Sequence, residues 1–536
     1  MELGTYQYTW LVIVGIVVFF SIRLAVGYWA SRRVSNAVDY IVAGRRLPIY
    51  LAGASIMATW FAAETLMGAS STAYQYGLQG VVFDPFGAAL CLFLSGFFFV
   101  RLMRRARYLT LIDFFERRYG KAMSLMGSVA QLLTYFAWTG AQIVAGGNIL
   151  HALLGIPVAT GMIAVALFVT AYTAMGGMWA DTMLDFMQMF FTAGGITLIF
   201  LGVLRAVGGW SGLVTEAGSL YVSNPFTLMP IPGEGYLGYT GYVGWFYWLA
   251  AWMAVGLGSV PAQDLMQRSM SARNEATAVW GTYMAGALYL FFGVMSPLIG
   301  IAMFKLNPNI APEQTEFLLV SAAMQHLNPV LTAIFIAALA SALMSTSDSS
   351  LLAGASVFTQ NIMQHLRGRQ LDEKEELRWT RIMVVIIGLV SVTLALLAGT
   401  IYKLAMVAWS LLLVGLFAPY AFGMYWQKAN RSGAIAAFLG GFIAWLIGIF
   451  AYYPQTIEAC AGDFECGLWD AIYISSTPAF LVSVILMVAV SLLTLKRDPA
   501  RPIQDVDGRF MSPKNRLGIL PLKKALSGKF EPEEME

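Results

Sequence analysis

The sequence predicts an all-α polytopic membrane protein, and three observations lead to that class. Charged residues make up 12% of the chain, about half of the roughly 25% found in soluble domains. Hydrophobic residues make up 58%, and apolar runs long enough to cross a bilayer as helices recur throughout. At 536 residues the chain could hold several soluble domains, but this composition excludes them. The net charge of +3 gives no indication of nucleic-acid binding, because the basic residues lie between the apolar runs.

Thirteen apolar segments are predicted to cross the membrane as helices. The first has no basic region before it and no small-residue cleavage site after it, so we expect a retained helix rather than a signal peptide. Residues 1–495 would then form a single transmembrane domain, and the polar tail 496–536 would be cytoplasmic and largely disordered. The apolar patch 517–522 in that tail could dock locally. The predicted segments are approximately 8–29, 49–77, 80–102, 122–151, 157–175, 182–206, 241–263, 276–304, 329–362, 379–400, 402–426, 432–453 and 471–495.

The basic residues predict the orientation. Arg and Lys cluster after the first, third, seventh, ninth, eleventh and last segments, for example at Arg45, Arg104, Arg268 and Lys428. Cytoplasmic loops carry an excess of Arg and Lys, so we expect the N-terminus outside and the C-terminus inside the plasma (inner) membrane. We interpret these clusters as topological signals and not as binding sites for a partner.

The chain contains three cysteines. Cys91 lies in an apolar run and is expected to be inert. Cys460 and Cys466 fall in one polar loop, which the predicted topology places outside the cytoplasm. A disulfide between them is therefore possible, and the sequence does not decide whether it forms.

The ninth segment carries a dense polar patch halfway along an apolar helix. Ser345, Thr346 and Ser349 share one face of that helix with Ala342, and Ser341 and Asp348 line the adjoining strip. Hydroxyl and carboxylate oxygens are the ligands that hard cations prefer. A helix-packing face of small residues would explain the serines. It would not explain Asp348, because an ionisable group at membrane depth is costly and indicates a functional site.

The order of the segments indicates an inverted repeat. Segments two to six (about 49–206) and seven to eleven (about 241–426) each hold five helices, and an odd number reverses the orientation of the second half. Such repeats place their site at mid-membrane beside broken helices. Gly53, Gly68 and the buried Glu64 make the second segment breakable. Unwinding near Ala58–Phe61 would free carbonyl oxygens for a cation.

Several motifs, in this order and on these segments, resemble the sodium:solute symporter family over about residues 8–495. The family fold is the inverted five-helix repeat of LeuT-like amino-acid transporters, so the resemblance implies one extra helix before the repeats and two after them. The matching motifs are Ala-Leu-Met-Ser-Thr-Ser-Asp-Ser-Ser-Leu-Leu (342–352), Tyr-Thr-Ala-Met-Gly-Gly-Met-Trp-Ala (172–180) followed by Asp185 and Gln188, Gln267-Arg268 with the four residues after them, and a late pattern from Pro419 to Ala434.

The resemblance implies two sodium sites. The first would use the backbone carbonyls of Ala58, Phe61 and Ala342 with the hydroxyls of Ser345 and Thr346. The second would use Asp185, Ser345, Asp348 and Ser349. Asp185 could instead be a structural hydrogen-bonding residue at the cytoplasmic end of its helix. Sodium would be the coupling ion, and no organic cofactor is expected.

The resemblance also gives candidate substrate residues, and it is greatest to the branch that carries choline. Trp60 and Trp138 match two aromatic positions that would enclose a quaternary ammonium, whereas Ala88 and Ala262 replace two others. Glu64 and Asp84 resemble acidic positions that serve hydroxyl-rich substrates in the sugar branch, and they would also suit a cationic amine. Gln142, Gln263 and Trp409 are further candidates.

We therefore expect a sodium-coupled symporter that imports a small organic solute by alternating access, with a quaternary ammonium or other cationic amine as the first candidate. A sugar, an amino acid or an organic acid is the alternative substrate, and proton coupling is the alternative to sodium. A transporter-like membrane sensor is the alternative of another class. An enzyme is not expected, because the sequence has no P-loop, no His-Glu-x-x-His motif and only three separated histidines.

Overall fold

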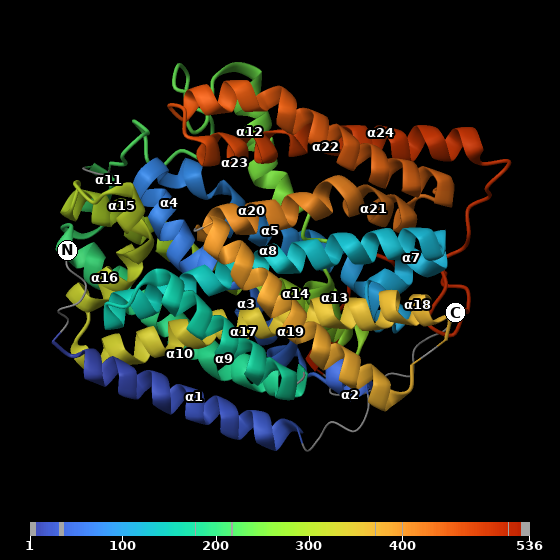
Figure 1. Ribbon diagram of the computed structural model, residues 1–536, viewed down its shortest axis with the longest axis horizontal. Helices are drawn as coiled ribbons and strands as arrows, with labels where there is room; N and C mark the ends of the chain where they lie inside the picture. Colours follow the sequence, from blue (N-terminus) through green and yellow to red (C-terminus); the bar gives the residue numbers. More distant parts are fainter. Residues whose placement is uncertain are drawn as a thin grey trace.

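The computed structural model describes residues 7–31, 37–176, 178–215, 218–369, 371–398, 400–512 and 514–526. Long helices run roughly parallel to one another across the molecule (Figure 1). Within the described residues, nine helices are long and apolar enough to cross a membrane. Each of the thirteen predicted ranges falls on helical structure, although several of those helices are interrupted.

The first predicted repeat begins after the peripheral helix α1 (Thr9–Ser31). It contains two helical units interrupted by π-helical or 3-10 turns, followed by three continuous long helices. Its elements are α3 (Ile49–Trp60), η3 (Glu64–Gly68), α4 (Ala69–Tyr76), η4 (Gly77–Val81), η5 (Val82–Gly87), α5 (Ala88–Leu94), η6 (Ser95–Phe99), α6 (Val100–Ala106), α7 (Ile112–Tyr119), α8 (Lys121–Leu154), α9 (Val158–Gly176) and α10 (Met178–Ala206).

The second predicted repeat and the helices after it follow a connecting stretch that contains α11 (Gly209–Thr215). Its elements are α12 (Gly241–Gly256), α13 (Gln263–Met270), α14 (Glu275–Gly293), α15 (Met295–Leu306), η7 (Pro312–Phe317), α16 (Leu318–His326), α17 (Pro329–Val357), η8 (Phe358–Met363), α18 (Gln364–Arg367), α19 (Glu373–Ala398), α20 (Ile401–Leu412), η9 (Leu413–Phe417), α21 (Ala418–Tyr425), α22 (Arg431–Ala459), α23 (Phe464–Ile474) and α24 (Ser476–Thr494).

The first helix of the first repeat is broken where the sequence predicts weakness. Helix α3 ends at Trp60, and Phe61 takes non-helical angles (φ −81°, ψ 66°). The N–H of Ala62 then donates to the carbonyl of Trp60 at 3.0 Å instead of to the carbonyl of Ala58, four residues back. The break therefore withdraws the ordinary helical partner of Ala58, which confirms the predicted interruption near Ala58–Phe61.

The corresponding helix of the second repeat is broken too, and here the prediction of a continuous helix over 241–263 was wrong. Helix α12 ends at Gly256, and α13 begins only at Gln263. Gly258 lies between them, and a Cβ there would stand 2.4 Å from the carbonyl oxygen of Trp409. Only glycine allows this close approach of the break to α20, and Pro261 is a further signal that the helix cannot continue.

Helix α17 occupies the centre of the bundle and packs against α1, α3, α8 and α10. Its side chains are buried almost continuously from Thr332 to Val357. Helix α1 lies along one edge beside α10, whereas α22 and α24 lie side by side at the opposite edge (Figure 1). The polar patch of α17 is therefore enclosed by other helices instead of facing lipid.

The described part of the C-terminal tail is packed against one end of the bundle, so the prediction of a largely disordered tail was wrong for that part. The N–H of Val506 donates to the carbonyl of Ala106 (2.9 Å), and the N–H of Gly518 donates to that of Phe97 (2.7 Å). The Trp280 indole donates to the carbonyl of Leu520 (2.8 Å). These backbone partners explain the order, and residues 527–536 lie outside the described part.

The connection between α22 and α23 contains a disulfide between Cys460 and Cys466. The sequence left this pairing open. Cys91 is buried and unpaired on α5, as the apolar run around it predicts.

Candidate functional site

The two helix breaks face each other in the middle of the bundle. Trp60, the last residue of α3, donates its indole N–H to Asp264 Oδ2 at 2.8 Å. Asp264 lies in the first turn of α13, and its Oδ1 accepts from the hydroxyl of Tyr135 on α8 (2.8 Å). Asp264 is fully buried. Asp264 was not among the predicted site residues, although a carboxylate directly after Gly258 and Pro261 marks the end of the second break.

Glu64 begins the helical turn that follows the first break, and two predicted residues hold its carboxylate. Trp138 Nε1 donates to Oε1 at 2.7 Å, and Gln142 Nε2 donates to Oε2 at 2.9 Å. The amide oxygen of Gln142 accepts in turn from the backbone N–H of Ala63 (3.2 Å). Helix α8 therefore fixes both the break and the carboxylate beside it.

Asp84 lies on the same side of the bundle, at an interruption between α4 and α5. Its carboxylate accepts from the hydroxyls of Thr65 (2.8 Å) and Tyr289 (2.8 Å). Thr65 directly follows Glu64 in the chain, so its hydrogen bond brings Asp84 close to the segment that carries Glu64. Asp84 and Glu64 are both almost completely buried, and within the described part of the chain neither forms an ion pair. Tyr289 is a second residue that the sequence analysis missed.

Aromatic rings complete this central cluster. The ring of Trp409 lies 5.9 Å from that of Trp60 and 4.9 Å, edge-on, from that of Trp138. The structure thus gathers six of the seven predicted substrate residues. Gln263 does not join them: its side chain accepts from the N–H of Leu111 (2.6 Å) and points toward the 109–111 loop.

The residues of the first predicted sodium site lie where α17 passes the break in α3. Thr346 Oγ1 donates to the carbonyl of Thr59 at 2.8 Å and so links the two helices. Ala58, Phe61, Ala342 and Ser345 are buried around this contact. Backbone and hydroxyl oxygens from two adjoining helices make a donor set that fits sodium, which takes hard oxygen ligands.

The residues of the second predicted site lie between α17 and α10. Asp185 accepts hydrogen bonds from Ser345 and from Ser55 Oγ (2.7 Å). Ser349 Oγ lies 3.1 Å from a carboxylate oxygen of Asp181, which the sequence analysis did not single out. These oxygen atoms also fit a hard cation. Asp348 points away from them toward α1 and α9, where Thr173 Oγ1 donates to it at 2.5 Å.

Two buried arginines neutralise part of this acidic cluster. Arg23 of α1 lies 2.9 Å from Asp348 Oδ2, and Arg268 of α13 lies 2.6 Å from Asp181 and 3.9 Å from Asp185. The interpretation of Arg268 as a loop charge was wrong, because the residue is 1% exposed inside the bundle. Arg23 could have been noticed as an isolated cation within the first apolar run.

A cavity of about 920 Å³ leads toward the central cluster from the end of the bundle opposite the tail. Aromatic and acidic side chains line it, including Tyr76, Tyr402, Trp469, Glu316 and Asp470. The Tyr402 hydroxyl accepts from the backbone N–H of Asp84 at 3.3 Å. The cavity therefore reaches the backbone of a residue of the central cluster.

Glu316 sits on the wall of this cavity and gives a pH-dependent prediction. Its carboxylate accepts from Asn148 Nδ2 (2.7 Å) and from the N–H of Ile401 (3.2 Å), and burial raises its pKa to about 7. A raised pKa makes the folded protein bind a proton that the unfolded chain releases above its ordinary pKa of about 4.5. The contribution of Glu316 to the free energy of unfolding is therefore fully present below pH ~4.5 and is lost as the pH rises through about 7.

The change Glu316→Gln should flatten this part of the stability profile. The wild-type unfolding free energy should fall by up to about 1.4 kcal/mol per pH unit within that window because of this one group. Thermal midpoints of both proteins, measured between pH 4 and pH 8, check the prediction. An unchanged slope in the variant would mean that Glu316 does not titrate there.

This geometry defines a class of protein. Two broken helices meet inside a helical bundle. Oxygen atoms suited to a hard cation lie beside the break in α3, and a cavity leads from one end of the bundle to the central cluster. Secondary transporters built from inverted repeats have this arrangement. Residues 40–441 match the family model of the sodium:solute symporter family. The chain belongs to this family, whose members are transporters and not enzymes.

Relatives and solved structures agree with that assignment. The chain is 27% identical to the human high affinity choline transporter 1 over 505 residues, covering 90% of this chain and 84% of that protein. It is 26% identical to a sodium/proline symporter of Staphylococcus aureus over 512 residues, covering 91% and 93%. A solved Na⁺-coupled sialic acid symporter superposes with a TM-score of 0.67 at 20% identity, covering 90% and 98%, which shows the shared LeuT-type fold.

Proposed function

We propose that this protein is a sodium-coupled symporter that carries a small organic cation, most simply a quaternary ammonium or another cationic amine, into the cell. Sodium coupling follows from the family. The substrate class rests on the central cluster of Trp60, Trp138, Trp409, Glu64 and Asp84. A choline-transporting relative supports it, and the proline-transporting relative supports a small amino acid as the alternative.

One observation carries the substrate class: within the described residues the buried carboxylates of Glu64 and Asp84 form no ion pair, and they belong to the same cluster as three tryptophans. A buried carboxylate is costly unless a positive charge or several hydrogen-bond donors compensate it. Glu64 and Asp84 have two donors each, all of them neutral. A bound organic cation would supply the missing charge and would face the electron-rich surfaces of the indole rings. A carboxylate substrate would increase the local repulsion instead.

The charges near α17 suggest how many cations the second site takes. Asp181, Asp185 and Asp348 supply three negative charges, and Arg23 and Arg268 supply two positive charges. One negative charge is left, which one sodium ion would balance at Asp185, Ser345 and Ser349. Asp348 would then act through its pair with Arg23, and not as a direct ligand. The first site adds a second sodium without a carboxylate.

Sodium binding and substrate binding would be coupled because both sites use the broken helix α3. Sodium at the first site would bridge the carbonyls of α3 and the hydroxyls of α17, in place of the direct contact from Thr346 to Thr59. That would fix the break in α3 and thereby orient Trp60 and Glu64 toward the substrate. Each sodium that moves inward gains about 2.3 kcal/mol per 100 mV of membrane potential. We place thirteen helices in the membrane, with the N-terminus outside and the tail of residues 496–536 in the cytoplasm.

Removal of two hydroxyls tests the first sodium site. Ser345→Ala and Thr346→Ala should each raise the sodium concentration needed for half-maximal uptake, by roughly 10- to 100-fold, because hydrogen-bonding or coordinating oxygens near a charge contribute about 1.5–3 kcal/mol. Ser347→Ala is the matched control, since that hydroxyl donates to the carbonyl of Leu343 in its own helix (2.8 Å). If uptake by both variants keeps the wild-type sodium dependence, the site is assigned wrongly.

Proton coupling is the second candidate, because the same buried carboxylates could carry protons. Replacing external sodium by potassium at fixed pH separates the two mechanisms. Uptake that persists in potassium and responds to a pH gradient would favour protons.

A further inference from the structure

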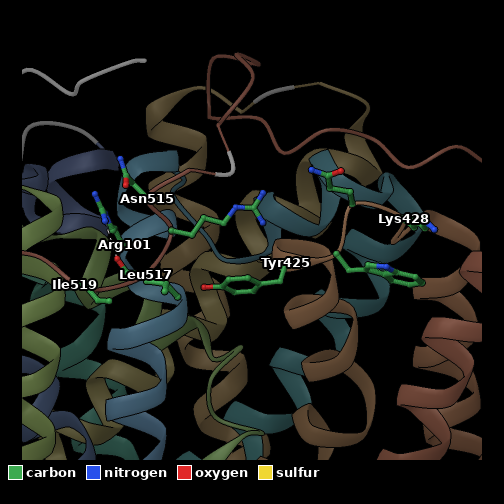
Figure 2. Close-up of a pocket in the computed structure, with 9 residues that line it drawn as sticks. Arg101, Tyr425, Lys428, Asn515, Leu517 and Ile519 are labelled. Atoms are coloured by element: carbon green, nitrogen blue, oxygen red, sulfur yellow. Dashed lines mark hydrogen bonds between the residues drawn. The ribbon is translucent and has the colours of Figure 1, made fainter.

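A second cavity, of about 930 Å³, lies at the end of the bundle where the C-terminal tail packs. Figure 2 shows Arg101, Asn515 and Leu517 on one side of it, Lys428 on the other, and the ring of Tyr425 between them. Three separate parts of the chain therefore build this cavity: the first turn of α6, the end of α21 with the residues after it, and the tail. The lining residues are Arg101, 425–428, 515–517 and Ile519.

The lining of this cavity is positively charged. It contains Arg101, Lys428 and Arg516 and no carboxylate. Arg101 is already paired with Glu275 (2.8 Å), whereas Lys428 and Arg516 form no ion pair within the described part of the chain. Arg516 donates to the carbonyl of Met424, but its buried Nε has no hydrogen-bond partner. Partial burial lowers the pKa of Arg516, and a bound anion would offset that desolvation.

The position of the cavity points to a lipid. It lies at the end of α21, whose apolar span finishes at Tyr425, and next to the end of the span containing α6. Tyr425 and Trp426 are the residue types that gather at a membrane surface. Ile519 is 69% exposed beside the cavity. A free phosphate would not need such an apolar neighbour, whereas a phospholipid places acyl chains next to its headgroup.

The tail segment 514–526 has the composition of a membrane-surface sequence. It carries Lys514, Arg516, Lys523 and Lys524 and no acidic residue. Its apolar residues from Leu517 to Leu522 lie between two basic pairs, Lys514 with Arg516 and Lys523 with Lys524, and Leu526 is 61% exposed. Basic clusters directly next to a membrane helix are attracted to anionic lipid headgroups.

We propose that this cavity binds the headgroup of an anionic phospholipid and that the bound lipid holds the tail segment 514–526 against the bundle. The phosphate would lie between Arg516 and Lys428, and the acyl chains would run past Ile519. The proposal does not depend on the transported substrate or on sodium.

The test uses the full-length protein in detergent, titrated with phosphatidylglycerol or with phosphatidylcholine, with lipid binding measured by native mass spectrometry. Phosphatidylglycerol should bind the wild type more tightly than phosphatidylcholine. Lys428→Gln should weaken that binding about 5-fold, and Lys428→Gln with Arg516→Gln about 30-fold, given the usual effect of one basic residue near an anionic surface. Lys428 is exposed, so its replacement leaves the fold intact.

The matched control is Lys496→Gln with Arg497→Gln, which removes two exposed charges after α24 without touching the cavity. Equal weakening in this control would overturn the site, because only overall charge would then matter. Glycerol phosphate, added as a competitor to the bound phosphatidylglycerol, separates a lipid from a soluble anion. If it competes as well as the lipid binds, the lipid proposal is wrong. Hydrogen exchange over 514–526 should slow with phosphatidylglycerol, and an unchanged rate would contradict the role in holding the tail.

Discussion

The change Glu64→Gln should weaken substrate binding by roughly 100-fold. In the wild type, both carboxylate oxygens accept hydrogen bonds, one from the indole of Trp138 and one from the amide of Gln142. A glutamine offers only one oxygen, so its NH₂ would face a second donor, and the negative charge is lost as well. Losing a charged hydrogen bond and creating an unsatisfied donor each have effects of about 1–3 kcal/mol, and 2.8 kcal/mol is 100-fold.

Binding of a radiolabelled cationic substrate in sodium measures this effect. Glu316→Gln is the matched control, since it makes the same chemical change on the wall of the outer cavity and should alter affinity less than about fivefold. Asp84→Asn is informative in another way. Its partners Thr65 and Tyr289 are hydroxyls, which can donate or accept, so this variant removes the charge while keeping the hydrogen bonds. Binding by Glu64→Gln within threefold of wild type would contradict the proposed cation site.

The change Arg23→Met should destabilise the protein by about 3–5 kcal/mol, which is the usual effect of leaving a buried charge without its partner. Arg23 is 2% exposed and lies 2.9 Å from Asp348. It also donates to the carbonyl of Ser341 (2.6 Å) and to the side chain of Gln188 (3.2 Å). Arg23 therefore links the peripheral helix α1 to the polar patch of α17, in addition to the packing of the two helices against each other.

A double-mutant cycle separates the ion pair from the packing of the long side chain. Asp348→Asn in the Arg23→Met background removes the orphaned carboxylate, so the double variant should be more stable than the sum of the two single changes predicts. The thermal midpoints of the wild type, the two single variants and the double variant give the coupling between Arg23 and Asp348. Additive effects would show that the pair contributes nothing and that α1 is held by apolar contacts alone.

The sequence predicted much of this fold because apolar length and small residues are local signals. The thirteen apolar ranges fall on helices, and the glycines and Glu64 marked the break in α3. The break after Gly256 was missed, since the apolar run continues through it to Val260 and only Gly258 and Pro261 interrupt the helical pattern. The order of the tail outside the apolar patch 517–522 was missed, because backbone hydrogen bonds to distant helices, such as that from Val506 to Ala106, leave no pattern in composition.

For the site, the residue types were predictable but their pairing was not. Trp60, Trp138 and Glu64 were found from the resemblance to a family, and the structure shows that two of them are hydrogen-bonded to each other. Arg23 and Asp264 were not found, and Arg268 was taken for a loop charge. Their partners lie hundreds of residues away or on another helix, and a charge inside an apolar run does not reveal whether it faces a loop, a lipid or a carboxylate. Gln263 was predicted only as a further cavity residue, and its side chain is instead directed to the backbone of Leu111 and Leu109.

The most direct test of sodium-coupled binding of an organic cation is the thermal midpoint of the purified protein with choline and other small quaternary ammonium ions, in sodium and in potassium at equal ionic strength. We expect the cation to raise the midpoint in sodium and to leave it unchanged in potassium, because a ligand stabilises only the state that it binds. Sugars, neutral amino acids and carboxylates serve as comparison ligands. Equal stabilisation in both salts, or stabilisation only by one of the comparison ligands, would contradict the account.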